Sequence, residues 1–427
     1  LGMGYDDTLL AEQRHPTRDE LDAAVPDKPV MLTHASGHLA VVNSLALQQA
    51  GITEQSVNPE GGVYGRDTEG RLNGLMEETA VSKLQVHATD IGFSTFLKMV
   101  RYASNEYAAK GVTTAQNGGA PKFLGQALAM ASYLGQVPFR LEIWPLFDEW
   151  GEELLEDPDS VSWYEQDRLN IGAIKIIADG SIQGYTGYLS QPYHQPFHED
   201  ETYQGYPRMP REKLFDWVDK FHRSGFQMAI HGNGDGAIDD IMAAFEAAQA
   251  QHPVEDPRLI LIHAQMARED QLTAMKEIGV SPSFFSAHTY YWGDRHRRLF
   301  MGPERAANMS PAASAVALDL PFTIHLDTPI VPMDPLFSVW TAVNRETRSG
   351  FVVGEHQRVS VLQALRAITI DAAWQIFREQ DLGSIEPSKL ADLVVLSSNP
   401  LESPKDLKDI RVEQTLVGGV NIFRTQP

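Results

Sequence analysis

Short apolar segments that end at a histidine or an aspartate recur along the C-terminal two-thirds of the chain. The segments FQMAIH and LILIH end at His231 and His263, and the segment PFTIHLD ends at Asp327. Runs this short and apolar are typical of parallel strands that are buried on both faces. His263 follows His231 by 32 residues and Asp327 follows His263 by 64, close to one and two βα units of about 31 residues in an eight-stranded barrel. The pattern predicts an α/β fold, a TIM (β/α)8 barrel with three polar groups at one mouth.

The same pattern predicts seven barrel strands. Amphipathic segments with apolar residues at helical spacing lie between them, and examples are residues 211–225, 236–251 and 268–279. Two of these segments end in the glycine that commonly follows a helix. The predicted strands are residues 111–116, 139–146, 172–178, 226–231, 259–263, 280–285 and 322–327.

A closed barrel needs an eighth strand, and nothing before Gly111 fits it well. We therefore expect the first strand to lie upstream of Leu1, with a breach between the strands at 111 and 322. Residues 1–90 would be an insertion between the first and second strands, in which 29–39 is strand-like, 41–52 is a short helix and a loop follows. This 427-residue chain would then be unstable and inactive alone, and the natural protein would be longer.

We assign residues 91–375 to the barrel and 376–427 to a second unit. Within the region after Val359, residues 360–377 are predicted to form a pair of helices. Residues 383–398 and 412–423 read as strands with turn signals between them. The second unit is therefore predicted to be the C-terminal part of a small β-sandwich.

Composition narrows the range of partners. The chain has 57 acidic and 35 basic residues, a net charge of −22, which argues against nucleic acid and anionic membranes because both favour basic patches. No apolar run reaches the roughly 18 residues of a membrane helix, and the first ten residues lack the features of a signal peptide. We expect a cytoplasmic protein. The most basic run, DRHRR (294–298), is predicted to be a solvated loop or helix start. With no cysteine, any metal site must use nitrogen and oxygen ligands.

An ordered series of motifs lies along the chain at barrel spacing. The motifs are GYDDTLL, RHPTRDELDAAVPDKPV, SGHLAVVNSLAL, GVTTAQNGG, AIKIIADGSIQ, MAIHGNGD, LIHAQ, FFSAHTYYWGD, HLDTPI and GSIEPSKLADLVVL. This series resembles the amidohydrolase superfamily of metal-dependent hydrolases. More narrowly, it is similar to the amidohydrolase-3 group, which includes N-substituted formamide deformylase. The chain departs from the family in having Ser388 where the last motif usually has glycine. It also contains no His-x-His, the superfamily's first metal motif.

The resemblance implies a hydrolase that cleaves a C–N bond of an amide, an N-acyl amine or an N-formyl amine. A divalent metal, with zinc favoured and one or two ions present, would hold the attacking hydroxide and polarise the carbonyl. His231, His263 and Asp327 match the metal ligands, and Asp327 would also carry the proton from the attacking water to the leaving nitrogen. Histidines satisfied by hydrogen bonds near a barrel end, and an aspartate that caps a helix, are the alternative interpretations.

Lys175 lies in the apolar segment 170–178, where an unpaired ammonium is costly to bury. In the family, a lysine at this strand end can be carboxylated by CO2 and bridge two metal ions. An ion pair with a barrel carboxylate, or a stem that reaches solvent, is the alternative interpretation.

His288 and His38 are the candidates for contact with the substrate. By position, His288 would bind the substrate carbonyl or the tetrahedral oxyanion, as a catalytic and substrate-binding residue, and His38 would reach the mouth from the insertion to bind the substrate. A structural role in a loop is the alternative for both. Asp179 and Asp235 are candidates for orienting the ligands, but ordinary loop capping is the favoured interpretation of both.

The sequence thus predicts a hydrolase with a small-molecule amide substrate and with no nucleic-acid or membrane partner. A homodimer is compatible with this prediction. Two other functions remain open. One is a metal-dependent lyase or isomerase on the same barrel, and the other is a non-catalytic or regulatory relative.

Overall fold

The fold, a computed structural model that describes residues 1–88, 92–164 and 167–425, is built around a parallel barrel sheet. Its two hydrogen-bonded parts are β6-β7-β8 and β9-β10-β11-β12-β13, and a bridge between Leu146 and Lys175 joins β7 to β9. The strands are β6 (Thr114–Ala120), β7 (Arg140–Pro145), β8 (Leu169–Ile171), β9 (Ile174–Ile177), β10 (Met228–Gly232), β11 (Leu259–His263), β12 (Val280–Phe284) and β13 (Thr323–Ile324).

All seven predicted barrel strands are therefore present, in the predicted order and parallel. The third is preceded by a short extra strand, β8, and the two are separated at Gly172. A Cβ atom at Gly172 would lie 2.9 Å from the Trp144 indole, so glycine here lets Trp144 fill the barrel axis. Within the described ranges, β6 pairs only with β7 and β13 only with β12. The sheet is open between these two edges, where the breach was predicted.

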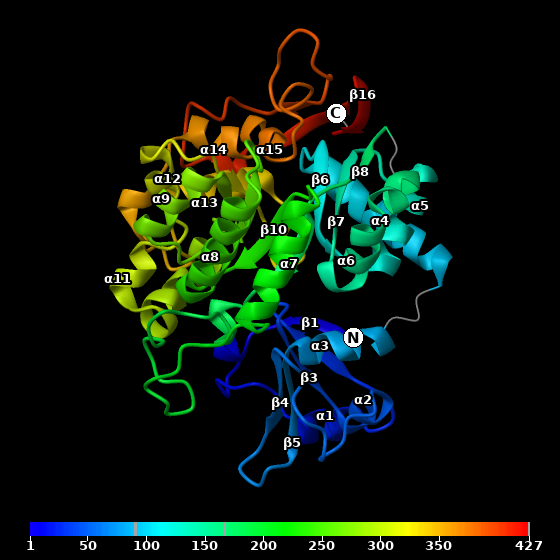
Figure 1. Cartoon of the computed structure of the whole chain (residues 1–427), viewed down its shortest axis with the longest axis vertical. Helices are drawn as coiled ribbons and strands as arrows, with labels where there is room; N and C mark the ends of the chain where they lie inside the picture. The colour runs from blue at the N-terminus through cyan, green and yellow to red at the C-terminus, as the bar shows by residue number, and fades with distance from the viewer. Residues whose placement is uncertain (89–91, 165–166, 426–427) are drawn as a thin grey trace.

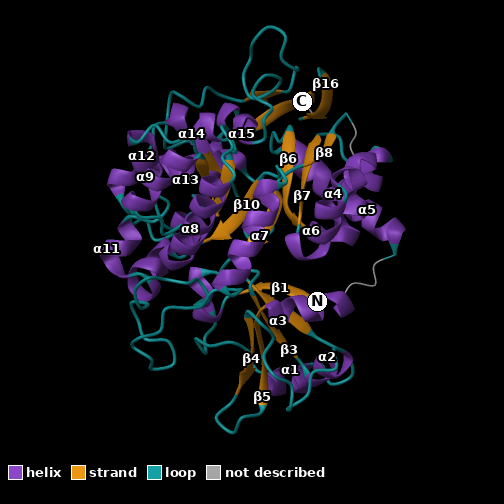
Figure 2. Cartoon of the chain, in the orientation of Figure 1, coloured by secondary structure: helices purple, strands orange, loops and turns teal. Residues whose placement is uncertain are grey.

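Helices cover the outer face of this sheet (Figure 2). The three predicted amphipathic segments form α7 (Arg211–Arg223), α8 (Asp235–Gln251) and α9 (Glu269–Ile278). Glycines with positive φ, Gly225 and Gly279, follow α7 and α9, as expected from the sequence. The main apolar core lies between sheet and helices. The other helices on the barrel are α4 (Phe93–Ala109), α5 (Lys122–Tyr133), α6 (Phe147–Glu156), α10 (His288–Arg295), α11 (Gly302–Ala307), α12 (Ala312–Ala317) and α13 (Pro335–Asn344).

The barrel interior is filled, so functional groups can gather only at its ends. A small apolar cluster of Trp144, Ala173, Ala229, Ile260 and Ile262 occupies the axis. At the end where the strands begin, Gln375 of α15 (Ile370–Gln375) inserts its amide. It donates to Ser281 Oγ at 2.8 Å and accepts from Thr323 Oγ1 at 3.1 Å. The opposite end, where the strands finish, therefore remains for chemistry.

The N-terminal region forms a second sheet of five strands, in the order β1-β2-β3-β5-β4. It differs from the expectation of one strand, one helix and a loop. Val41 and Val42 belong to β3, and the helix begins only at Ser44, where the Asn43 side chain caps it. The expected loop contains a hairpin whose turn is held by the Asp67 carboxylate. The elements are β1 (Gly2–Tyr5), α1 (Arg18–Ala24), β2 (Met31–His34), β3 (Leu39–Val42), α2 (Ser44–Gln49), β4 (Gly62–Arg66), β5 (Leu72–Glu78) and α3 (Thr79–Ala88).

This N-terminal sheet docks on the barrel near the mouth (Figure 1). Tyr206 donates to Glu77 at 2.9 Å and Lys213 pairs with Glu60 at 2.7 Å. Asp6 pairs with Arg295. That last contact overturns the expectation that 294–298 is solvated, because Arg295 and its neighbour His296 are both buried.

The C-terminal region forms the predicted helix pair, α14 (Val361–Ala367) and α15, followed by an antiparallel sheet. Its strands are β14 (Leu393–Leu396), β15 (Val412–Val417) and β16 (Val420–Arg424). Arg140 at the start of β7 pairs with Asp392 at 2.7 Å, which fixes this sheet to the barrel. The division into 1–90, 91–375 and 376–427 remains a proposal that limited proteolysis tests. A helix long and apolar enough to cross a membrane does not occur in the described part of the chain.

Because the N-terminal sheet docks through the buried carboxyl group of Glu77, we expect the stability of the protein to depend on pH. Burial raises the pKa of Glu77 from 4.5 to about 7, so its contribution is complete below pH 4.5 and is lost as pH rises through 7. Replacing it by the neutral isostere, Glu77→Gln, should make the protein more stable at pH 8 by on the order of 2–3 kcal/mol. Urea unfolding at pH 4.5, 6 and 8 measures this.

Asp179, whose pKa is also raised to about 7 by burial, adds a slope of the same sign. The substitution should therefore flatten the pH dependence of unfolding without abolishing it. The exposed Glu413→Gln is the matched control and should leave the profile unchanged. An equal slope in the Glu77→Gln variant and the wild type would contradict the prediction.

Candidate metal and active site

Three imidazoles, those of His231 and His263 buried and that of His325 half-buried, form a row at the mouth of the barrel. His231 lies on β10, His263 ends β11 and His325 directly follows β13. His231 Nδ1 lies 3.1 Å from His263 Nε2, and His263 Nδ1 lies 3.0 Å from His325 Nε2. The row ends at Ser283 Oγ, 2.9 Å from His325 Nδ1.

Each contact between two ring nitrogens needs one proton, so the tautomers of the three rings are coupled. If the rings are neutral, all three carry their proton on Nε2 or all three carry it on Nδ1. Burial lowers the pKa of His231 and His263 well below the usual range, and lowers that of His325 to about 3. The row is therefore neutral near pH 7, the state in which imidazole binds a metal.

The backbone at two strand ends turns sharply to bring side chains into the mouth. Ile260 and Ile262 point into the barrel, so strict alternation along β11 would send His263 outward. Instead His263 has a φ of 69°, in the left-handed region, and contacts the row. Asp327 has a φ of 55°. Strained backbone of this kind clusters at functional sites.

Lys175 and Asp327 face the same space as the histidines. Lys175 is buried on β9, and a Cβ atom at Gly119 on β6 would lie 3.5 Å from Lys175 Cγ, so the side chain crosses the barrel interior. Burial lowers the pKa of Lys175 to about 8, and the charge of Asp327 acts in the opposite direction. The protein around the Asp327 carboxyl group raises its pKa, although the residue is open to solvent. Asp327 caps no helix among the described residues, since Asp334 caps α13.

The donor set fits a metal such as zinc. Two nitrogen ligands about 2.0–2.1 Å from a tetrahedral ion are about 3.3 Å apart, close to the 3.1 Å between His231 Nδ1 and His263 Nε2. The other nitrogen of His231 lies 3.2 Å from Gly180 O and 3.4 Å from the Asp179 carboxylate. Partners of this kind orient metal-binding histidines.

The two predicted substrate contacts flank this row on opposite sides. The His38 ring lies 5.2 Å from that of His231, and the His288 ring lies 6.2 Å from that of His263. His288 Nδ1 is buried without a hydrogen-bond partner in the described chain. The sequence-predicted site residues His38, Lys175, His231, His263, His288 and Asp327 are therefore brought together at one mouth.

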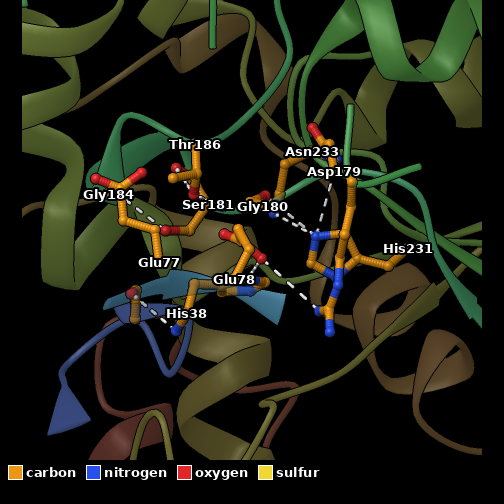
Figure 3. Close-up of polar contacts among 12 residues, drawn as sticks. His38, Glu77, Glu78, Asp179, Gly180, Ser181, Gly184, Thr186, His231 and Asn233 are labelled. Atoms are coloured by element: carbon orange, nitrogen blue, oxygen red, sulfur yellow. Dashed lines mark hydrogen bonds and ion pairs between the residues drawn. The ribbon is translucent and has the colours of Figure 1, made fainter. Parts of the chain in front are cut away.

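The two aspartates singled out as orienting residues differ in position. Asp179 accepts the backbone N–H groups of Tyr188, Asn233 and Gly234 and lies beside His231 (Figure 3). Asp235 begins α8 and binds Ser190 and Arg268, outside this group. The structure thus leaves only Asp179 in a position to orient the histidines.

Sequence reasoning missed His325, Glu78 and Arg208. His325 could have been found from its position, because it precedes Asp327 by two residues in a strand-like segment and so shares its face. Glu78 approaches the mouth only through the docking of the N-terminal sheet, where it meets Arg208 of the segment before α7, and this docking carries no local sequence signal. A further cluster of Asp6, Asp7 and His34 could hold a metal, but Asp6 is paired with Arg295 and Asp7 with His34.

Comparison with known proteins gives a consistent picture. The profile of the amidohydrolase family matches residues 1–423. N-substituted formamide deformylase of Arthrobacter pascens is 28% identical over 98% of this chain and 78% of its own length. The protein LONG AFTER FAR-RED 3 of Arabidopsis thaliana is 27% identical over 99% of this chain and 73% of its own.

Among solved structures, an uncharacterized metal-dependent hydrolase from Pyrococcus furiosus is similar to this chain. The TM-score is 0.68 at 26% identity, and the match covers 94% of this chain and 78% of that one.

The imidazole row leads to a spectroscopic prediction. In protein stripped of metal at pH 6, His231, His263 and His325 should all be neutral and should all carry the proton on the same ring nitrogen. The rings should be neutral because burial lowers their pKa values, and they should share one tautomer because each contact between two rings holds a single proton. Long-range ¹⁵N–¹H correlation spectra, assigned with single His→Asn variants, measure the tautomers. A protonated imidazolium, or mixed tautomers within the row, would show that the row does not exist in solution.

Proposed function

The chain belongs to the amidohydrolase family, and from this premise we propose a metal-dependent hydrolysis of an amide at the barrel mouth. It is a hydrolase of C–N bonds other than peptide bonds. The substrate we propose is an N-acyl or N-formyl amine, in line with the deformylase similar to it. The convergence of His231 and His263, with their facing nitrogens 3.1 Å apart, is the observation that carries the proposal.

We propose that His231, His263 and Asp327 hold a divalent metal, with zinc favoured by a set of imidazole and carboxylate donors. When bound, the metal supplies a Lewis acid for the carbonyl and lowers the pKa of water. Asp179 and Gly180 orient His231 through its other nitrogen.

Asp327 is suited to move the proton of the reaction. Hydrolysis adds water to the carbonyl carbon, breaks the C–N bond and releases a carboxylic acid and an amine. The carboxylate of Asp327 takes a proton from the attacking water and gives it to the departing nitrogen. A raised pKa favours this role, because a group that both takes and gives a proton works best near the operating pH.

His288 and His38 bind the substrate from the two sides of the row. A ring N–H of His288 can donate to the carbonyl oxygen, on which negative charge grows during attack, whereas the free nitrogen of His38 faces the amide group of the substrate. The unpartnered Nδ1 of His288 supports this role. The substrate is a small molecule, and the homodimer and the cytoplasmic location remain predictions that light scattering and cell fractionation test.

The metal proposal predicts a loss of both metal and activity. His263→Asn should lower bound zinc, measured by elemental analysis, and lower hydrolysis by about 100-fold or more, because one of few ligands is lost. The exposed His252→Asn is the matched control and should leave both unchanged.

Hydrolysis in ¹⁸O-labelled water should place solvent oxygen in the acid product, whereas a lyase or isomerase would incorporate none. Full activity in metal-free protein would refute the proposal.

We also propose that Lys175 is carboxylated and serves as a bridging ligand. A pKa lowered to about 8 by burial leaves a sizeable share of neutral amine near pH 7–8, the form that attacks CO2. The ¹³C spectrum of protein incubated with labelled bicarbonate and zinc should contain a carbamate signal. Lys175→Ala should abolish this signal, whereas Lys213→Ala should not. A carbamate signal that persists in Lys175→Ala would show that Lys175 is not the carboxylated residue.

A further inference from the structure

Two adjacent carboxylates, Glu77 and Glu78, end strand β5 where the N-terminal sheet meets the barrel. Glu77 accepts a hydrogen bond from Tyr206 and holds the two parts together. Glu78 lies closer to the mouth and is almost fully buried. A carboxylate that is buried this completely requires partners, and its partners indicate what it does.

Glu78 is joined twice to His38, which directly precedes the adjacent antiparallel strand β3. The Glu78 backbone N–H donates to His38 O at 2.8 Å, and Glu78 Oε2 lies 2.9 Å from His38 Nδ1. These contacts fix both the backbone and the ring of His38. Figure 3 shows the pair beside the loop Asp179–Gly180–Ser181.

The other side of Glu78 is held by the barrel. Arg208 Nη1 lies 3.7 Å from Glu78 Oε2, and the Arg208 backbone N–H donates to Ala178 O at 2.7 Å. Gly180 allows the carboxylate to come close, since a Cβ atom there would lie 2.1 Å from Glu78 Oε1. Gly180 O is also the contact of His231 Nε2, at 3.2 Å. One glycine therefore touches both the Glu78–His38 pair and the candidate metal ligand.

The geometry leaves one nitrogen of His38 for the mouth. Nδ1 faces Glu78, whereas Nε2 takes part in none of the hydrogen bonds among the described residues. The ring meets His231 edge to face, with centroids 5.2 Å apart. His38 is partly open to solvent, with 17% of its side chain exposed, so a substrate can reach it.

We propose that Glu78 is a positioning residue that accepts a hydrogen bond from His38 Nδ1–H, so that the unprotonated Nε2 of His38 accepts a hydrogen bond from the amide N–H of the substrate. The inference rests on the proposed hydrolysis and deepens it. By this contact the N-terminal sheet completes a site that is otherwise built by the barrel. Glu77, on the same strand end, has no such role and serves only in docking.

The neighbouring pair offers a matched experiment. Glu78→Gln, His38→Asn, the double variant and the control Glu77→Gln are compared in the full-length, zinc-loaded protein, with 4-nitroformanilide as the chromogenic probe. Glu78→Gln should lower kcat about tenfold or more, with KM within about threefold and with unchanged zinc content and Tm. Glu77→Gln should keep kcat within about twofold. The double variant should be no slower than His38→Asn alone, because both changes remove one unit.

A second readout does not depend on activity. In ¹⁵N–¹H correlation spectra, the His38 Nδ1 of the wild type should be protonated at each pH from 6 to 9. In Glu78→Gln the ring should populate the Nε2–H tautomer as well. An effect of Glu78→Gln that appears only in Tm would indicate a docking role and overturn the inference.

The outcomes separate this inference from the proposed function. If the wild type neither binds zinc nor cleaves the probe, the hydrolase proposal fails, and the positioning role fails with it. If the wild type is active and Glu78→Gln retains its kcat, or the double variant shows additive losses, only the positioning role fails.

Discussion

Loss of solvent at the barrel mouth is the constraint on which the arrangement of the site depends. A polar group taken out of water is costly unless another group replaces the hydrogen bonds of water. At this mouth the replacements are mutual: imidazole nitrogens face one another, and Asp179 accepts three backbone N–H groups. The same burial keeps His231 and His263 neutral, and the protein around the Asp327 carboxyl group raises its pKa. Desolvation thus sets both the geometry and the chemistry.

This constraint also explains why two parts of the chain meet at the mouth. The open end of the barrel would leave Lys175 and the histidine row in water. The N-terminal sheet covers them and contributes His38. Glu78 of the same sheet pairs with His38 and faces Arg208 of the barrel, so the buried Glu78 carboxylate has charged partners on both sides. In the barrel, Gly180 accommodates the cover because it has no side chain. The same sheet that covers the mouth therefore also brings His38 to it.

The barrel and its central residues were predictable because their signals are local and periodic. Each buried parallel strand is a short apolar run, and the spacing of His231, His263 and Asp327 follows the βα unit. The N-terminal strands were harder to predict, because the apolar run of β3 ends only two residues before α2 begins, and Val41 and Val42 were therefore assigned to the helix. Arg295 shows the limit most clearly: its sequence neighbours suggest solvent, and only Asp6, far away in the chain, buries it. Glu78 was missed for the same reason, because its partners lie in another part of the chain.

The left-handed backbone at His263 and Asp327 restricts which residues can ever occupy these positions. Histidine, aspartate and asparagine tolerate positive φ better than most side chains, whereas bulky or β-branched residues do not. The backbone therefore selects from the same small set of residues that a metal of borderline softness selects. A designer who wished to exchange these candidate ligands would find β-branched side chains disfavoured at both strand ends. The main chain therefore limits which side chains these two positions can carry, whatever ion is bound.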